Sequence, residues 1–159
     1  MTAEAVDWDA VYATHAPSLL AYLRRLSQDV ETAEDLMQTT FQRAMTARSL
    51  PPLHEMRPWL YRVASNLVID RARRAKLLRF IPFTGTEVAA GRDVDEVDAV
   101  REALRAIAPE QAIALVLRLH EGFSRAEIAA MTGVSERAVK LRLEQGRAAF
   151  AAAYRRATE

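Results

Sequence analysis

The chain has 159 residues, of which half are apolar, with 22 basic and 21 acidic side chains and no cysteine. This length suits one domain or two small ones, and the apolar content is too high for a wholly disordered chain. Without cysteine the chain forms neither a disulfide nor a thiolate metal site. We find no signal peptide and no apolar run near the ~18 residues that span a membrane, so we expect a cytoplasmic protein.

The charges are segregated along the chain. Residues 1–42 carry 2 basic and 7 acidic groups, and residues 43–83 carry 9 and 2. Residues 84–110 carry 3 and 7, and residues 111–159 carry 8 and 5. Such an alternation favours two different kinds of partner, although the charge of solvated helix faces also varies by chance.

The spacing of apolar residues predicts helices only, because no segment alternates as a strand would and Ala, Leu, Arg and Glu are abundant. Asp29 is placed to cap one helix, and the Pro51-Pro52 pair enforces a loop. Residues 80–96 lose the helical pattern and read as a polar, acidic linker. The expected helices cover residues 7–14, 17–27, 30–48, 57–79, 95–107, 109–121, 125–132 and 136–156.

The helix predicted at 30–48 has two contrasting faces. One is apolar and suits a core: Ala33, Leu36, Met37, Phe41 and Ala44. The other is polar and mostly acidic, and in isolation it would be read as a solvated surface: Glu31, Asp35, Gln38 and Gln42.

The helix predicted at 57–79 also has two stripes. An apolar stripe faces a core and consists of Leu60, Val63, Ala64, Leu67 and Val68. The second stripe places aromatic, cationic and amide groups together, and consists of Trp59, Arg62, Asn66, Asp70 and Arg73. Such groups suit nucleic acid with unpaired bases, since rings stack, Arg holds phosphate and Asn reads base edges. Trp59 has an equally good alternative role as a core anchor, and the two roles are compatible.

Residues 123–147, FSRAEIAAMTGVSERAVKLRLEQGR, predict a helix-turn-helix. Ser124 and Glu127 form a capping box, and Gly133 suits the left-handed turn between the two helices. Ser135 caps the second helix, which presents Glu136, Arg137, Lys140, Arg142 and Gln145 to a DNA groove. A purely structural three-helix unit is the alternative.

Enzymatic chemistry has little support in the sequence. His15, His54 and His120 lie on separate predicted elements without ligand-like spacing, so we expect no metal site. We find neither a phosphate-binding glycine loop nor a nucleophile motif. We therefore expect a protein that is not an enzyme and has no cofactor.

Three segments in order resemble the extracytoplasmic-function (ECF) sigma factors of bacterial RNA polymerase, which belong to the sigma-70 family. AEDLMQTTF at 33–41 is similar to the opening segment, and RPWLYRVASNLVIDRARR at 57–74 to the DNA-melting segment. Residues 106–147 are similar to the fourth region. The resemblance implies two small helical domains joined by a flexible acidic linker.

The implied domains are a four-helix region 2 domain at 1–80, a linker at 81–97 and a region 4 helix-turn-helix domain at 98–159. Residues 80–96, if fully extended, reach at most roughly 60 Å, so the domains could lie more than one DNA turn (~34 Å) apart.

The resemblance also implies three sets of site residues. Polymerase binding falls on Glu31, Asp35, Gln38 and Gln42. Recognition and melting of the minus-ten element fall on His54, Trp59, Arg62, Asn66, Asp70, Arg71, Arg73 and Arg74. Recognition of the minus-thirty-five element falls on Ser135, Glu136, Arg137, Lys140 and Arg142.

Two segments depart from the commoner family pattern. The loop Ser49–Met56, which would capture a flipped base, has two prolines, Leu53 and His54 where the family often has an aromatic residue and a glycine. In the last helix Leu141, Glu144, Gln145 and Gly146 stand where the family usually has a small polar residue followed by basic ones. The captured base and the preferred promoter sequence therefore stay open.

The function implied is that of a non-catalytic subunit that binds core RNA polymerase, recognises promoter DNA and melts it. An anti-sigma factor is a further potential partner. One alternative is a stand-alone helix-turn-helix regulator, which leaves the polar face at 31–42 unexplained. The other is a sigma-like mimic that sequesters an anti-sigma factor, against which the basic residues Arg71, Arg73, Arg74, Lys140 and Arg142 argue.

Overall fold

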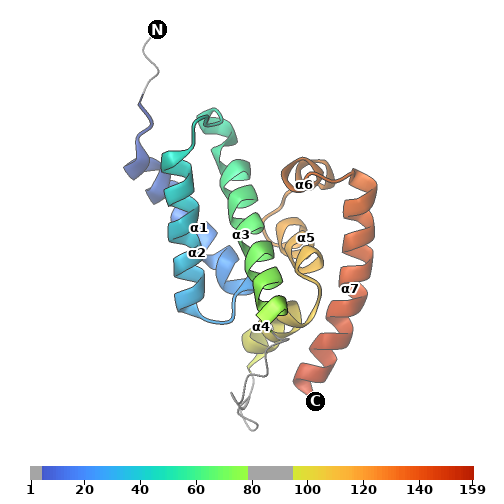
Figure 1. The fold of residues 1–159 in the computed structure, drawn as a ribbon. Coiled ribbons are helices and arrows are strands. Elements are labelled where there is room, and N and C mark those ends of the chain that lie inside the picture. Colours follow the sequence, from blue (N-terminus) through green and yellow to red (C-terminus); the bar gives the residue numbers. More distant parts are fainter. Residues whose placement is uncertain (1–4, 79–94) are drawn as a thin grey trace.

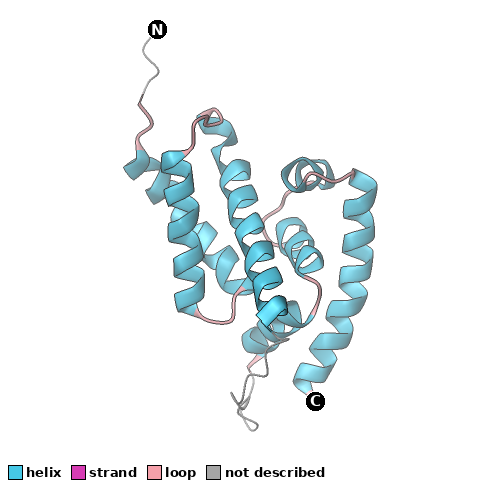
Figure 2. Cartoon of the chain, viewed as in Figure 1, coloured by secondary structure: helices cyan, strands magenta, loops and turns pink. Residues whose placement is uncertain are grey.

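The computed structural model of the chain describes residues 5–78 and 95–159, and both ranges fold into helices (Figure 1, Figure 2). These ranges contain no strand, and the predicted all-α fold with two helical units is confirmed. Most of the predicted linker at 81–97 lies outside the described residues. The elements are α1 (Trp8–Leu26), α2 (Val30–Thr46), the 3-10 turn η1 (Leu53–Glu55), α3 (Met56–Leu78), α4 (Glu96–Ala106), α5 (Pro109–Leu119), α6 (Arg125–Thr132) and α7 (Glu136–Thr158).

One prediction about the helices is wrong. The separate helices expected at 7–14 and 17–27 form the single helix α1, which contains Pro17. A proline inside a helix leaves the carbonyl four residues earlier without its N–H partner. Here Ala13 and Pro17 are both exposed, so water can satisfy the freed carbonyl of Ala13. The rest of α1 is held by its buried side, which consists of Val11, Ala16, Leu19, Tyr22 and Leu23.

The N-terminal unit (α1–α3) therefore has three α-helices around its core, where four were expected. The predicted apolar face of α2 is buried throughout, and on α3 only Val63 of the predicted apolar stripe stays half-buried. Tyr22 and Ser65 meet in this core with their hydroxyl oxygens 2.7 Å apart. Burial raises the pKa of Tyr22, so its hydroxyl remains a neutral hydrogen-bonding group.

The C-terminal unit (α4–α7) contains the predicted helix-turn-helix. Ser124 and Glu127 form the expected capping box, and Gly133 has a φ of 71° at the turn. Gly146, which costs helix propensity, lies where α7 crosses α5 closely. A Cβ atom at this position would lie 3.2 Å from Cβ of Gln111 and 3.3 Å from Cδ1 of Leu115.

The two units pack side by side, with α3 between the other helices of its own unit and those of the C-terminal unit (Figure 1). Helix α3 contacts α5 and α6, and α1 contacts α4 and α5. Buried residues of both units belong to one continuous apolar cluster. No helix in the described part of the chain is both long and apolar enough to cross a membrane.

Candidate polymerase and nucleic-acid interfaces

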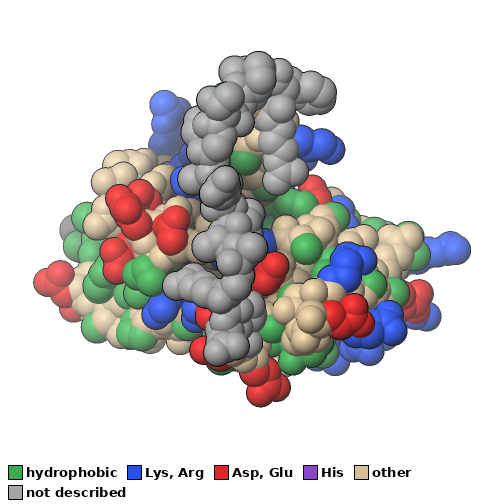
Figure 3. All heavy atoms as spheres, turned by 90° about the horizontal axis from the view of Figure 1, so that it is seen from below, with side chains coloured by type: hydrophobic (Ala, Val, Ile, Leu, Met, Phe, Trp, Pro, Cys, Tyr) green, Lys and Arg blue, Asp and Glu red, His purple; other side chains and the backbone are tan. Residues whose placement is uncertain are grey.

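The polar face of α2 is exposed as a continuous strip. Glu31, Asp35, Gln38 and Gln42 all lie on the solvent side of the helix. Asp29 caps the start of the helix, and its Oδ1 accepts a 2.7 Å hydrogen bond from the main-chain N–H of Thr32. This hydrogen bond lowers the pKa of Asp29, so the start of the strip carries a carboxylate. Figure 3, which views the molecule from below, shows acidic side chains gathered on the side of α1 and α2.

The second predicted surface follows α3. Arg62, Asn66, Arg71, Arg73 and Arg74 are exposed, and Asp70 is half-buried. Trp59 is half-buried and packs against the apolar cluster, so its ring combines contact with the core and access to solvent. The structure thus places the predicted basic and amide side chains on one helix with an unbroken core on its other side.

The loop between α2 and α3 leads directly into this surface. Met56 is fully buried and anchors the end of the loop. Leu53, at 67% exposure, and the well-exposed His54 stand at the tip, in the turn η1. The loop therefore presents an apolar side chain and an imidazole beside the start of α3.

The third predicted surface is the first half of α7. The hydroxyl of Ser135 accepts a hydrogen bond of 3.0 Å from the main-chain N–H of Ala138, so this oxygen caps the helix. Glu136, Arg137 and Lys140 are exposed, and Arg142 is half-buried at the edge of the face. Leu141, with 52% exposure, occupies the middle of this face, one turn after Arg137. In the sequence Leu141 is only a departure from the family pattern, although its spacing of four residues from Arg137 already places the two side chains on the same side of the helix.

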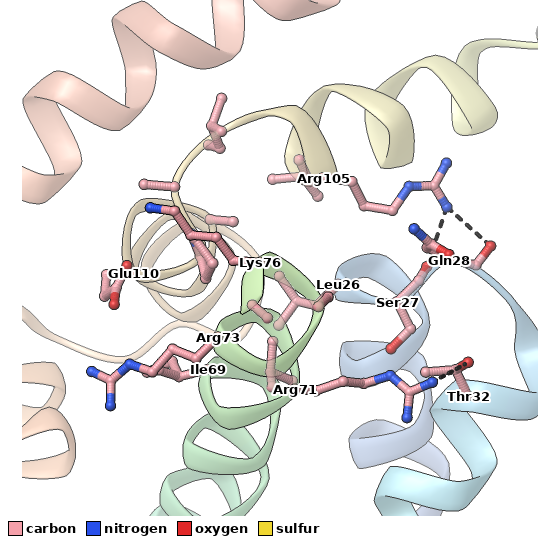
Figure 4. Close-up of a pocket in the computed structure, with 18 of the residues that line it drawn as sticks. Leu26, Ser27, Gln28, Thr32, Ile69, Arg71, Arg73, Lys76, Arg105 and Glu110 are labelled. Carbon is pink, nitrogen blue, oxygen red and sulfur yellow. Dashed lines mark hydrogen bonds between the residues drawn. The ribbon is translucent and has the colours of Figure 1, made fainter. Parts of the chain in front are cut away.

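A cleft of about 760 Å³ separates the far end of α3 from α4 and the start of α5. Arg105 crosses it and donates from Nη1 to the main-chain carbonyls of Ser27 (3.3 Å) and Gln28 (3.0 Å), at the end of α1 (Figure 4). Arg71, on the α3 side, donates from Nη2 to Oγ1 of Thr32 over 3.4 Å. The cleft is therefore lined by cationic side chains, some of which belong to the basic end of α3.

Sequence reasoning missed the residues that join the two units. Arg57 and Tyr61 at the start of α3 contact Glu121 and Phe123, which lie between α5 and α6. Such contacts join positions about sixty residues apart, and no local pattern marks them.

No group of three or more His, Cys, Asp or Glu side chains within residues 5–78 and 95–159 is arranged to hold a metal ion. The three histidines lie in α1, in η1 and at the end of α5.

Comparison with known proteins identifies the family to which this fold belongs. The family described as Sigma-70 region 2 matches residues 11–77, and the family described as Sigma-70, region 4 matches residues 98–150. The ECF RNA polymerase sigma factor SigL of Mycobacterium tuberculosis is 32% identical over 150 residues, covering 89% of this chain and 85% of SigL. The RNA polymerase sigma factor CarQ of Myxococcus xanthus is 31% identical over 146 residues, covering 87% and 84%.

Two solved structures share the fold. CnrH, in complex with the cytosolic domain of CnrY, aligns with a TM-score of 0.67 and 26% identity over 91% of this chain and 84% of CnrH. The sigma factor RpoE, in complex with the anti-sigma factor NepR from Bartonella quintana, aligns with a TM-score of 0.72 and 24% identity over 94% and 97%.

These matches define a sigma-70-type transcription factor with regions 2 and 4. The chain belongs to the ECF sigma factors. The predicted family and the predicted function in transcription initiation are thereby confirmed. A stand-alone helix-turn-helix regulator is disfavoured because the N-terminal unit matches region 2 of the family.

Proposed function

We propose that this chain binds core RNA polymerase through the polar face of α2 and recognises promoter DNA through α3 and α7. Residues 1–80 would form the polymerase-binding and melting domain, residues 81–97 the linker, and residues 98–159 the domain for the minus-thirty-five element. The observation that carries this proposal is the exposure of all three predicted surfaces, each on a helix whose opposite side is buried.

The proposed polymerase surface consists of Glu31, Asp35, Gln38 and Gln42. Their carboxylates and amides accept hydrogen bonds and favour a basic or amide-rich partner. A flat polar strip on a rigid helix suits docking against another helix. Asp35 and Gln38 lie in the middle of the strip, so we expect them to contribute most of the binding free energy.

The proposed minus-ten surface combines the loop before α3 with the exposed side of that helix. Extruding a base from a duplex costs a few kcal/mol, whereas stacking on a ring returns about 1–3 kcal/mol per base. The exposed part of Trp59 offers a ring, and Asn66 offers an amide for base edges. The loop tip at Leu53 and His54 directly precedes the helix that carries both residues. The basic end of α3, at Arg71, Arg73 and Arg74, would hold the phosphates.

The proposed minus-thirty-five surface is the exposed start of α7. A helix that enters the major groove reads bases with its first turns, and this helix begins at Glu136, directly after its cap Ser135. Arg137 and Lys140 are exposed there and can reach phosphates or guanine edges. Each module alone would bind weakly, and linking the two raises the effective concentration of the second.

We also propose a cellular compartment and a regulatory partner for this chain. The chain would act in the cytoplasm as a non-catalytic subunit, since phosphodiester formation belongs to the polymerase. Two structural relatives were solved as complexes, one with the anti-sigma factor NepR and one with CnrY. We therefore include an anti-sigma factor among the expected partners of this chain.

Run-off transcription tests the proposal. Purified core polymerase is supplied with the chain and with fragmented DNA from the organism of origin, and start sites are mapped. Discrete new starts should appear with the native chain and fall more than tenfold with Asp35→Arg. Glu102→Arg is the matched control, since Glu102 is an exposed acidic residue of α4 outside the three surfaces, and it should transcribe normally.

Two other outcomes would reject the proposal. Tight duplex binding without polymerase and without new starts would indicate a stand-alone regulator. Neither binding nor transcription would indicate the sequestering mimic.

A further inference from the structure

The two units are joined by a cluster that we call the Glu121 latch, which consists of Arg57, Tyr61, Glu121 and Phe123. The Glu121 side chain is only 8% exposed. Its Oε2 accepts a hydrogen bond from the Tyr61 hydroxyl (3.0 Å) and an ion-paired one from Nη2 of Arg57 (3.4 Å). The same Nη2 donates to the main-chain carbonyl of Glu121 over 3.0 Å. Oε2 of this carboxylate is thus held by two side chains of the N-terminal unit, whereas its Oε1 lies 3.4 Å from Nδ1 of His120 in its own unit.

The turn that carries Glu121 has a fixed geometry. The main-chain N–H groups of His120 and Glu121 both donate to the carbonyl of Val116, at 3.0 Å each. Gly122 has a φ of 78°, which side chains with a Cβ atom rarely adopt, and the next N–H, of Phe123, donates back to Leu117. Hydrogen bonds within the C-terminal unit therefore fix the main chain at Glu121, and its side chain extends from this turn to Arg57 and Tyr61 of α3.

Arg57 is held from the side as well. Its guanidinium carbon lies 4.2 Å from the ring centre of Phe123 and 5.0 Å from that of Tyr61. The two rings meet edge to face, with centres 5.5 Å apart. Burial, and next the charge of Glu121, raise the pKa of Tyr61, so its hydroxyl stays a neutral donor to the carboxylate. The ion pair, the hydrogen bonds and the contacts with the two rings thus all stabilise the same closed arrangement.

Two further polar contacts join the units outside the latch. Nη2 of Arg25 lies 2.7 Å from Nε2 of His120. Arg105 donates to the carbonyls of Ser27 and Gln28 at the end of α1. When the units separate, all these polar groups return to water, which offsets much of what the contacts contribute. Apolar side chains of both units also meet at this interface, so opening exposes part of the shared cluster to water, and the partner that opens the interface must offset this cost.

The closed arrangement conflicts with simultaneous binding to both promoter elements. By their positions these elements lie about 25 base pairs apart, or roughly 85 Å at one turn per ~34 Å. A helix of 23 residues, the longest in the described part of the chain, is only ~35 Å long. Contacts of 3.0 Å between α3 and the turn after α5 leave the two reading helices far too close together.

We propose that the Glu121 latch holds the free sigma factor closed and must open before α3 and α7 can engage both promoter elements. The inference rests on the proposed promoter-binding function. A partner opens the latch only if it binds the open state more tightly, so core polymerase or promoter DNA would have to supply that difference. Weakening the latch should therefore favour the binding-competent state.

Pulsed electron-electron double resonance, which measures the distance between two spin labels, tests the closed state on the full chain. The chain has no native cysteine, so Ser18→Cys in α1 and Ala151→Cys in α7 allow two spin labels to be placed at exposed sites outside the latch. The native latch should give a single short and narrow distance distribution. Glu121→Arg should shift it to longer and broader distances, because it places a cation against Arg57. Tyr61→Phe, which removes only the hydroxyl donor, should give a smaller shift in the same direction.

Controls separate opening from unfolding. Glu102→Arg introduces the same charge change at an exposed site of α4 and should leave the distribution unchanged. Circular dichroism should show unchanged helix content in Glu121→Arg. Identical distributions for the native, Glu121→Arg and Glu102→Arg chains would overturn the proposal, as would a broad distribution for the native chain.

Run-off transcription at limiting core polymerase then tests the consequence. Glu121→Arg should raise the transcript yield several-fold over the native chain. An unchanged or lower yield from an opened chain would overturn the regulatory part of the proposal. If neither chain supports transcription although the distances shift as expected, the proposed promoter function fails while the latch itself stands.

Discussion

The two proposed DNA-reading helices, α3 and α7, have the same length but different surroundings. Each has 23 residues and an exposed row of basic side chains. Helix α3 lies between helices of both units and buries seven residues, whereas α7 lies on the outside and buries four (Figure 1). Binding and stability therefore depend on the same turns in α3, while the start of α7 can change its exposed face with little effect on the fold.

The largest effect should come from the core side of α3. Leu60→Ala removes a fully buried side chain and should lower the free energy of unfolding by about 3–5 kcal/mol. Leu143→Ala, at a 6% exposed site on the outer helix, should cost about 2–3 kcal/mol, because the site can relax towards solvent. Urea denaturation followed by circular dichroism measures both. An equal or larger loss for Leu143→Ala would contradict the proposed difference between the helices.

The exposed side of α3 should affect melting rather than duplex binding. Asn66→Ala removes an exposed amide, whose base contact is worth about 1–3 kcal/mol, so open-complex formation should fall about tenfold. Permanganate reactivity of unpaired thymines in the minus-ten element measures this step. Lys140→Ala provides the contrast, since it should weaken binding to the duplex minus-thirty-five element instead. Equal defects in both assays for the two variants would show that the surfaces are not specialised.

A smaller effect should follow from filling the close crossing of α5 and α7. Replacing glycine by alanine inside a helix usually gains up to ~1 kcal/mol. At Gly146 the added Cβ would lie 3.2 Å from Cβ of Gln111, so α5 must move. We expect Gly146→Ala to lose about 1 kcal/mol of stability overall, because tight cores resist added atoms. A gain in thermal stability would show that α5 shifts without loss.

The smallest effect should be on base preference at α7. Leu141 is exposed in the middle of the reading face, where an apolar side chain can contact the methyl group of thymine. Replacing each thymine of the minus-thirty-five element in turn by deoxyuridine removes only that methyl group. One such replacement should weaken binding about threefold, in line with ~0.8 kcal/mol per buried carbon, and Leu141→Ser should abolish the difference. If the native and Leu141→Ser chains distinguished thymine from deoxyuridine equally well, Leu141 would not contact the base.

The local features of the fold were largely predictable from the sequence. The buried face of α2, the Asp29 cap and the capping box at Ser124 depend on residues within one or two turns of each other. The continuity of α1 through Pro17 was not predictable, because it depends on which side of the helix faces solvent. The latch between Tyr61 and Glu121 was missed for a related reason, since it joins distant segments without a shared motif. The side chains proposed to bind DNA were selected by spacing and resemblance, and their roles remain predictions.

Site-specific photo-crosslinking tests the central claim that α3 and α7 read two separate promoter elements. A photoreactive amino acid is placed at Asn66 or at Leu141 in the full chain, which is assembled with core polymerase on a mapped promoter. We predict a crosslink from position 66 to an unpaired base of the minus-ten element, and one from position 141 to duplex DNA more than two helical turns upstream. Crosslinks from both positions within a single turn, or from position 141 alone, would contradict the claim.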